Sequence, residues 1–132
     1  TERLNLYTQL SNIKTEEELH KFELEVKDRF GELPEQVANL FISVRLKWIG
    51  SKLGLEKLVM KHNKLIGYFI SDQQSSFYQS KNFTKLLQYI QANPTACKMK
   101  EKQTRNGLRL LLTFDNIKSV KGAKSTLDGI LA

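Results

Sequence analysis

The residues whose type and spacing indicate a chemistry in this chain are charged side chains in two short stretches. In ELEVKDRFGELPEQV, residues 23–37, Glu25, Asp28 and Arg29 stand three and four positions apart. Residues at this spacing share one face of a helix. Here that face points away from the apolar stripe, with Leu24 among the charges. Such a face either forms charge-assisted pairs with a partner protein or is an ordinary solvated surface with one exposed leucine.

The second stretch is CKMKEKQTRNGLR, residues 97–109. Its basic residues are Lys98, Lys100, Lys102 and Arg105. On a strand the alternating lysines would point to one face, with Cys97 and Met99 on the other. They are candidate phosphate contacts for a nucleic acid, or the solvated face of an edge strand where lysines discourage unwanted pairing. No aromatic residue alternates with the lysines, as a platform for stacked bases would require, and this favours the edge-strand interpretation.

Patterns typical of catalysis or of cofactor binding are missing from the sequence. It contains no GxxxxGK[ST], GxGxxG or GxSxG motif. The single cysteine, Cys97, excludes an internal disulfide, and His20 and His62 lie far apart with no further ligand at metal-binding spacing. We therefore expect a non-enzymatic chain with no metal and no cofactor, in a reducing cytoplasm.

The composition is that of a globular protein with an uneven charge. The 132 residues are 40% apolar and 27% charged, which fits one compact domain. No apolar run approaches the roughly 20 residues of a membrane span, and we expect a monomer with no membrane partner. Residues 1–53 hold eight Lys and Arg and nine Asp and Glu, whereas residues 54–132 hold thirteen and five, a balance of +8. The chain starts at Thr1 rather than Met, so we expect a fragment of a longer protein.

Helical spacing of apolar residues predicts two helices before residue 31. The first is marked by Leu6, Tyr7, Leu10 and Ile13. The second starts at a capping box, in which Thr15 and Glu18 each accept a hydrogen bond from the other's amide. Its core face would carry Leu19, Phe22, Val26 and Phe30. Truncating Phe30 to alanine should then destabilise the fold by about 3–5 kcal/mol.

Gly31 and Pro34 predict an elbow between the second helix and a third. Glycine suits a left-handed C-cap, and proline suits the first turn of a helix. The third helix would run to about Leu53, with Gly54 as its stop. Its apolar residues fall on two stripes, so we expect it to be a central scaffold sandwiched between layers. The stripes are Val37, Leu40, Phe41, Val44 and Trp48, and Ile42, Leu46, Ile49 and Leu53.

After Gly54 the period changes to that of strands. Residues 55–61 and 64–71 predict two strands around a His62–Asn63 turn, followed by a short strand near Phe77 and Tyr78 and a helix over 82–93. The pattern repeats in strands 96–102 and 108–114, around a turn at residues 105–107, and in a last helix over about 116–131. We therefore predict an α+β fold: a three-helix segment, residues 1–54, packed with an antiparallel sheet of two strand-strand-helix units, residues 55–132. Spacing does not determine the strand order.

The run from Glu25 to Pro34 resembles the C-terminal domain of bacterial transcription-repair coupling factors, whose pattern is approximately E-x-x-D-R-F-G-x-x-P. An R-L-x-x-Y-x-x-L opening at residues 3–10, a K-T-E-x-E-L stretch at residues 14–19 and the segment RLKWIGSKLGLEKL, residues 45–58, strengthen the resemblance. From residue 59 onward only the order of elements is shared.

The resemblance implies the C-terminal regulatory domain of a DNA translocase that recognises stalled RNA polymerase and recruits nucleotide excision repair. The domain would dock on the UvrB-like module of the same chain, masking the surface for the damage-recognition ATPase and restraining the ATP-hydrolysing motor. RNA polymerase and DNA would be contacted through other domains.

Under that resemblance, Glu25, Asp28 and Arg29, with Leu24 beside them, are the expected docking residues. Simultaneous replacement of Glu25, Asp28 and Arg29 by alanine should release the domain from the UvrB-like module without unfolding it. The alternative is an independent basic nucleic-acid-binding domain, which would use Lys98, Lys100, Lys102 and Arg105. An isolated domain that binds DNA with a steep salt dependence would favour this alternative.

Overall fold

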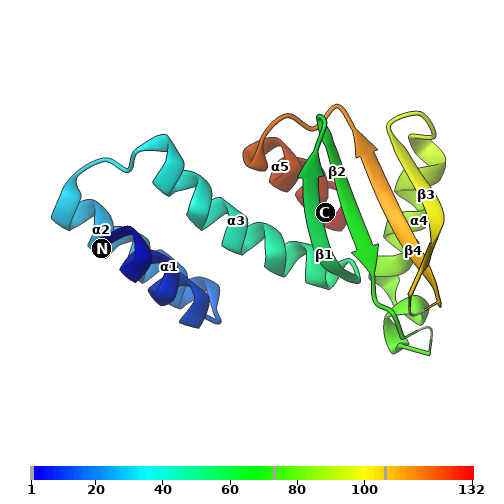
Figure 1. Cartoon of the computed structure of the whole chain (residues 1–132), viewed down its shortest axis with the longest axis horizontal. Coiled ribbons are helices and arrows are strands. Elements are labelled where there is room, and N and C mark those ends of the chain that lie inside the picture. Colours follow the sequence, from blue (N-terminus) through cyan, green and yellow to red (C-terminus); the bar gives the residue numbers. More distant parts are fainter. Residues whose placement is uncertain (1, 73, 106) are drawn as a thin grey trace. The chain divides into compact units, whose positions relative to one another are not determined.

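The computed structural model of the chain describes residues 2–72, 74–105 and 107–132, with side chains from Asn5 onward. It divides into two compact units, Thr1–Arg45 and Leu46–Ala132. The first unit holds the helices α1 (Glu2–Asn12), α2 (Glu16–Phe30) and the first part of α3 (Glu35–Lys52). The second holds the end of α3 and an antiparallel sheet with further helices, so the predicted α+β fold is confirmed (Figure 1).

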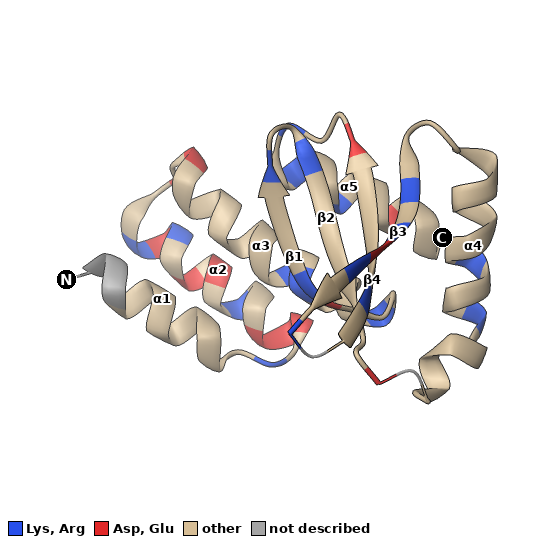
Figure 2. Ribbon diagram, turned by 45° about the vertical axis from the view of Figure 1, so that its right-hand side comes forward, with Lys and Arg blue, Asp and Glu red and all other residues tan. Residues whose placement is uncertain are grey.

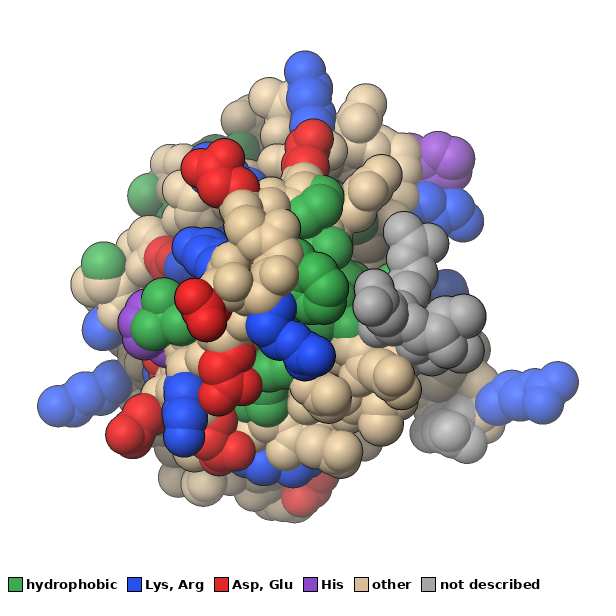
Figure 3. Space-filling model, turned by 90° about the vertical axis from the view of Figure 1, so that its left-hand side faces the viewer, with side chains coloured by type: hydrophobic (Ala, Val, Ile, Leu, Met, Phe, Trp, Pro, Cys, Tyr) green, Lys and Arg blue, Asp and Glu red, His purple; other side chains and the backbone are tan. Residues whose placement is uncertain are grey.

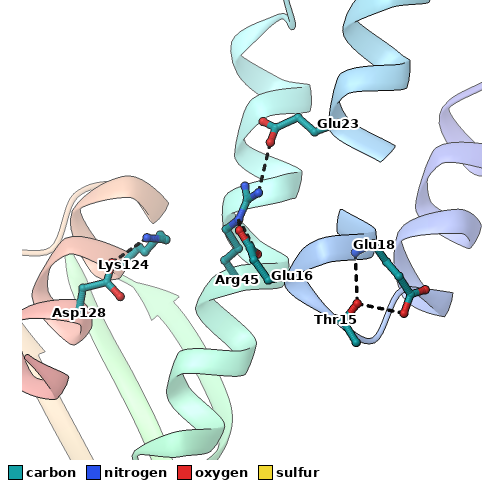
Figure 4. Close-up of polar contacts among 7 residues, drawn as sticks. All are labelled: Thr15, Glu16, Glu18, Glu23, Arg45, Lys124 and Asp128. Atoms are coloured by element: carbon teal, nitrogen blue, oxygen red, sulfur yellow. Dashed lines mark hydrogen bonds and ion pairs between the residues drawn. The ribbon is translucent and has the colours of Figure 1, made fainter. Parts of the chain in front are cut away.

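Helix α2 starts at the predicted cap, although only half of the capping box forms. The amide of Glu18 donates to Oγ1 of Thr15 at 3.2 Å. The reverse bond differs from the expectation, because the Thr15 hydroxyl donates to the Glu18 carboxylate at 3.1 Å (Figure 4). Acidic residues fill the first turn, where they also suit the positive end of the helix dipole.

Gly31 ends α2 in a conformation that requires glycine. Its φ is 78° and its ψ is −157°. This region is essentially closed to residues with a Cβ, and it differs from the left-handed helical region expected. The Gly31 amide donates to the carbonyl of Lys27 at 2.8 Å and so closes the last turn. Three residues later the carbonyl of Pro34 accepts from Ala38, and α3 begins.

The first part of helix α3 belongs to the first unit, and its end belongs to the second unit. In the first unit its Phe41 is fully buried and packs against Phe22 of α2, with the ring centroids 5.8 Å apart. In the second unit Leu46 and Leu53 belong to the core beneath the sheet. The two apolar stripes seen in the sequence therefore belong in large part to consecutive halves of one helix.

Four strands form the sheet of the second unit, in the order β1-β2-β4-β3, all antiparallel. Their bounds are β1 (Leu55–Lys61), β2 (Lys64–Phe69), β3 (Cys97–Thr104) and β4 (Gly107–Asp115). Helices α4 (Lys81–Ala92) and α5 (Val120–Leu131) lie on one side of it (Figures 1 and 2). The core between sheet and helices is dense, with Phe69, Leu86 and Leu127 fully buried.

The β1–β2 hairpin has the predicted two-residue turn. His62 and Asn63 have φ angles of 53° and 60°, and Lys61 pairs with Lys64 on either side. Positive φ at both central residues is the geometry that matches the twist of the flanking strands. In the second predicted turn, Asn106 lies outside the described residues, and the flanking pair is Thr104 with Gly107.

Two elements differ from the sequence prediction. Phe77 and Tyr78 lie in a short 3-10 helix, η1 (Ser76–Gln79), rather than a strand, because Ser75 caps it and the two rings pack edge-on against Phe83. Helix α5 starts at Val120 instead of about residue 116. Its cap is Ser119, which accepts from the amide of Gly122 at 3.0 Å.

Candidate docking surface on the helical unit

Helix α2 presents all four predicted docking residues to solvent. Glu25, Asp28 and Arg29 are exposed, and Leu24 keeps 52% of its surface accessible. Their exposure fits either of the two interpretations, a docking face or a solvated surface. The surroundings of these side chains distinguish between the two interpretations.

Beside α2 lies a groove of about 610 Å³ within the first unit. Its apolar lining comes from α1, α2, the segment between α2 and α3, and the start of α3, and includes Leu6, Phe22, Val26, Leu33, Val37 and Leu40. Glu25 and Arg29 also line it, whereas Leu24 and Asp28 do not. The expectation that the charged residues point away from the apolar stripe is therefore wrong for Glu25 and Arg29, which stand at the edge of that stripe.

Phe30 is the main correction to the sequence analysis. Helical spacing predicts it in the core, and the structure leaves 60% of it exposed. As the last residue of α2, directly before the Gly31 elbow, it lines the groove together with Pro34 instead of entering the packed centre. The guanidinium carbon of Arg29 lies 5.7 Å from the Phe30 ring centroid, which is within cation–π range.

A charged cluster on the other side of α2 holds the helix against α3. Nε of Arg45 donates to both carboxylate oxygens of Glu16, at 2.9 and 3.0 Å, and Nη2 donates to Glu23 at 3.2 Å (Figure 4). The Arg45 side chain is only 18% exposed, and its bond to Glu23 is partly shielded from water, whereas the Glu16 side chain is 62% exposed. No local pattern predicts this cluster, because Arg45 lies 22 and 29 residues from its partners.

Apolar and charged side chains alternate closely on this face of the molecule. Figure 3 shows a hollow with hydrophobic side chains, bordered by acidic and basic ones. Such a surface offers apolar contact area with a hydrogen-bond acceptor and a donor at its rim, which is the composition of a protein interface. Among the described residues there is no cluster of His, Cys, Asp or Glu that could hold a metal ion. None of the described helices is long and apolar enough to cross a membrane.

The sequence-predicted basic residues lie elsewhere, in the second unit. Lys98, Lys100 and Lys102 are exposed on β3, which is an edge strand, and Arg105 is exposed in the β3–β4 turn. Cys97 faces the core from the same strand, as its alternation with the lysines predicts. Burial raises the pKa of the Cys97 thiol to about 12, with a smaller contribution from Asp115. A thiol held protonated in this way is not a nucleophile.

Comparisons with known proteins identify relatives of one kind. The family described as TRCF domain matches residues 1–80. A transcription-repair-coupling factor of Buchnera aphidicola is 29% identical over 114 residues, 86% of this chain and 13% of that protein. Its namesake in Escherichia coli K12 is 41% identical over 56 residues, 42% of this chain and 5% of that protein. The chain thus spans a small part of the length of the curated relatives it matches.

The fold has a counterpart among solved structures. The crystal structure of the C-terminal domain of a transcription-repair coupling factor superposes with a TM-score of 0.63. The match covers 97% of this chain and 78% of that one, at 22% sequence identity. At this identity the likeness shows a shared fold.

Proposed function

Because this chain belongs to the TRCF domain family, found in transcription-repair-coupling factors, we propose that it is a non-catalytic docking domain which regulates a longer protein. Its partner would be the UvrB-like module of that same protein. Docked there, it would mask the surface for the damage-recognition ATPase and restrain the motor until RNA polymerase is engaged. The site of action would be the bacterial cytoplasm.

The observation that carries this proposal is the edge of α2 beside the groove. There Glu25 and Arg29, four residues apart, flank apolar residues that the unit leaves uncovered. A carboxylate and a guanidinium held on one rigid helix favour paired, oriented contacts with opposite charges on a partner. Leu24, which is half exposed, and Asp28 extend this surface around the helix.

The expected strength of such contacts suits a latch that has to open. An exposed ion pair contributes only about 0.2–1 kcal/mol. Full burial of an exposed leucine or phenylalanine side chain contributes about 1.5–3 kcal/mol. Leu24 and Phe30 are each more than half exposed and are available for such burial. Docking within one protein has a high effective concentration, so a few such contacts are enough to keep the domain docked. Because each contact is weak, a competing partner is able to release the domain.

The test is the basal ATPase rate of the full-length protein. We expect the triple variant Glu25→Ala, Asp28→Ala, Arg29→Ala to raise this rate while its thermal unfolding stays unchanged. The three side chains are exposed, so their removal leaves the packed centre of the unit intact.

A matched control is available on the same helix. Glu17 and Lys21 are exposed, four residues apart and of the same charges as Glu25 and Arg29, but they do not line the groove. We expect Glu25→Ala with Arg29→Ala to raise the ATPase rate and Glu17→Ala with Lys21→Ala to leave it at the wild-type value. An unchanged rate in a normally folded triple variant would rule out the latch.

A further inference from the structure

One face of the sheet in the second unit carries no helix. Leu65, Gly67 and Phe69 of β2 are buried on the side where α4 and α5 lie. Ile66 and Tyr68, which alternate with them, point to the opposite side and are partly exposed. Figures 1 and 2 both show the helices on one side of the strands. Within the described part of residues 46–132, the outer face of the sheet is therefore open.

The strand register brings an aromatic ring into line with the lysines. Across one row of the outer face, Lys57 pairs with Tyr68, Tyr68 with Leu111, and Leu111 with Lys100. The centre of this row is aromatic and apolar, and both of its edges are cationic. The neighbouring row consists of Val59, Ile66, Thr113 and Lys98. The sequence alone does not reveal this aromatic residue, because Tyr68 lies far along the chain from the β3 lysines and enters the same row, two strands away from them, only through the strand order.

The outer face is strongly basic and mostly unneutralised. Its basic residues are Lys57, Lys61, Lys64, Lys98, Lys100, Lys102 and Arg109. Lys64 is 3.6 Å from Asp115, and Arg109 is paired with Glu56. The other five lysines have no carboxylate partner among the described residues. Figure 2 shows Lys or Arg positions on each of the four strands.

Two cations of this chain already contact the ring of Tyr68. The ammonium of Lys57 lies 5.4 Å from its ring centroid, and the guanidinium carbon of Arg109 lies 5.7 Å from it. The ring is thus held on the open face beside Lys57, which has no carboxylate partner among the described residues and is available to a phosphate, while Arg109 is paired with Glu56. This is the arrangement in which a stacked base and its backbone are bound together.

We propose that this outer face binds single-stranded nucleic acid, with bases on Tyr68, Ile66 and Leu111 and phosphates on the lysines of the two edge strands. The edges are separated by three strand spacings, roughly 14 Å, which leaves room for bases between them. A duplex keeps its bases stacked inside and would use the lysines alone. An acidic peptide without apolar side chains would likewise leave the aromatic and apolar centre without a role. This function would be separate from the docking surface on α2.

The first experiment measures fluorescence anisotropy of a labelled 12-nucleotide oligothymidylate with the whole chain at 50 and 200 mM salt. We expect micromolar binding that weakens with salt. Replacing the three β3 lysines by glutamine, K98Q/K100Q/K102Q, should weaken binding about tenfold and reduce the log–log salt slope by about 2, since each phosphate contact on a single strand contributes about 0.7.

The matched control removes the same charge from the same unit. Lys81, Lys118 and Lys121 are exposed on, or next to, the helices on the other side of the sheet. The variant K81Q/K118Q/K121Q should bind within about twofold of the wild type. Equal weakening in the two triple variants would show that net charge alone attracts the oligonucleotide, and would overturn the proposal.

A second variant separates bases from phosphates. Tyr68→Leu keeps an apolar side chain on the strand and removes the stacking surface. It should weaken oligothymidylate binding about tenfold and leave the binding of inorganic polyphosphate unchanged. Circular dichroism verifies the fold of each variant.

Three further results would overturn the proposal. The first is equal or tighter binding of a duplex of the same length. The second is equal binding of polyglutamate, which would identify an acidic protein as the partner of this face. The third is an absence of oligothymidylate binding at 50 mM salt.

Discussion

The two units of this chain differ in how completely they cover their apolar side chains. In the sheet unit, Phe69 and Phe114 are at most 1% exposed. In the helical unit, Leu24 and Phe30 are 52% and 60% exposed, and the groove beside them is lined by further apolar residues. A three-helix unit as short as Thr1–Arg45 has too little interior to enclose all of its apolar surface. What remains uncovered is available to a partner.

The two units also differ in net charge. Residues 1–45 contain six Lys and Arg and nine Asp and Glu, a balance of −3, and residues 46–132 contain fifteen and five, a balance of +10. The mixed, weakly acidic unit combines ion pairs with apolar contact. The basic unit presents lysines around a tyrosine on an open sheet. Different partners are therefore expected for the two units.

The largest effect that would test this contrast is a truncation in the sheet core. Phe69 is fully buried, and its ring centroid lies 6.3 Å from that of Phe83 and 6.4 Å from that of Tyr78. We expect Phe69→Ala to lower the free energy of unfolding by about 3–5 kcal/mol, measured by urea denaturation. A loss below about 1 kcal/mol would mean that the sheet unit is packed as loosely as the helical one.

The next effect is a loss of stability at alkaline pH that belongs to the sheet unit. The Cys97 thiol has a pKa near 9.0 when unfolded and about 12 when folded, because burial disfavours the thiolate. Between these values the unfolded chain releases a proton that the folded chain retains, so stability falls as pH rises. The loss in the free energy of unfolding that is due to Cys97 should be about 2 kcal/mol at pH 10.5 and negligible at pH 8.

The control for this pH effect is Cys97→Ala, compared with the wild type by urea denaturation at both pH values. The alanine variant should lose less stability between pH 8 and pH 10.5. Burial raises the pKa of Tyr78 and of Tyr89 in both proteins, so this part of their effect is common to the two, whereas the smaller contribution of Cys97 to the pKa of Tyr89 is lost with the thiol. Equal losses in the two proteins would contradict the prediction.

The smallest effect is expected for Phe30→Ala in the helical unit. Because its ring is mostly exposed, truncation should lower the free energy of unfolding by less than about 1 kcal/mol. The same phenylalanine-to-alanine change at Phe69 serves as its matched comparison. A loss at Phe30 as large as at Phe69 would show that the groove is closed in solution.

Local signals are sufficient for most elements of the fold. The apolar residues of 55–61 predict β1 with its observed bounds, and His62–Asn63 predicts the turn, because both depend on neighbours in the chain. The sequence predicts a strand where Phe77 and Tyr78 form a short 3-10 helix, since a pair of aromatic residues is compatible with a strand and with a helical turn. Its ring contacts with Phe83 involve a separate helix and leave no local trace.

The candidate site is predictable only in part. The spacing of Glu25, Asp28 and Arg29 predicts their exposure on α2, while the groove that Glu25 and Arg29 border is formed by three helices. Helical periodicity assigns Phe30 to the core because it reports which face a residue occupies. It does not report whether another element covers that face at the helix end.

By itself the sequence determined most of the helices, strands and turns, and the recognisable family pattern around Glu25 and Pro34, because these depend on residues within a few positions of one another. The tertiary structure alone decided the strand order, the partners of Arg45, and the row across the sheet that contains Lys57, Tyr68 and Lys100. Such contacts join residues far apart in the chain. They depend on how whole elements pack, and no short-range spacing encodes that packing.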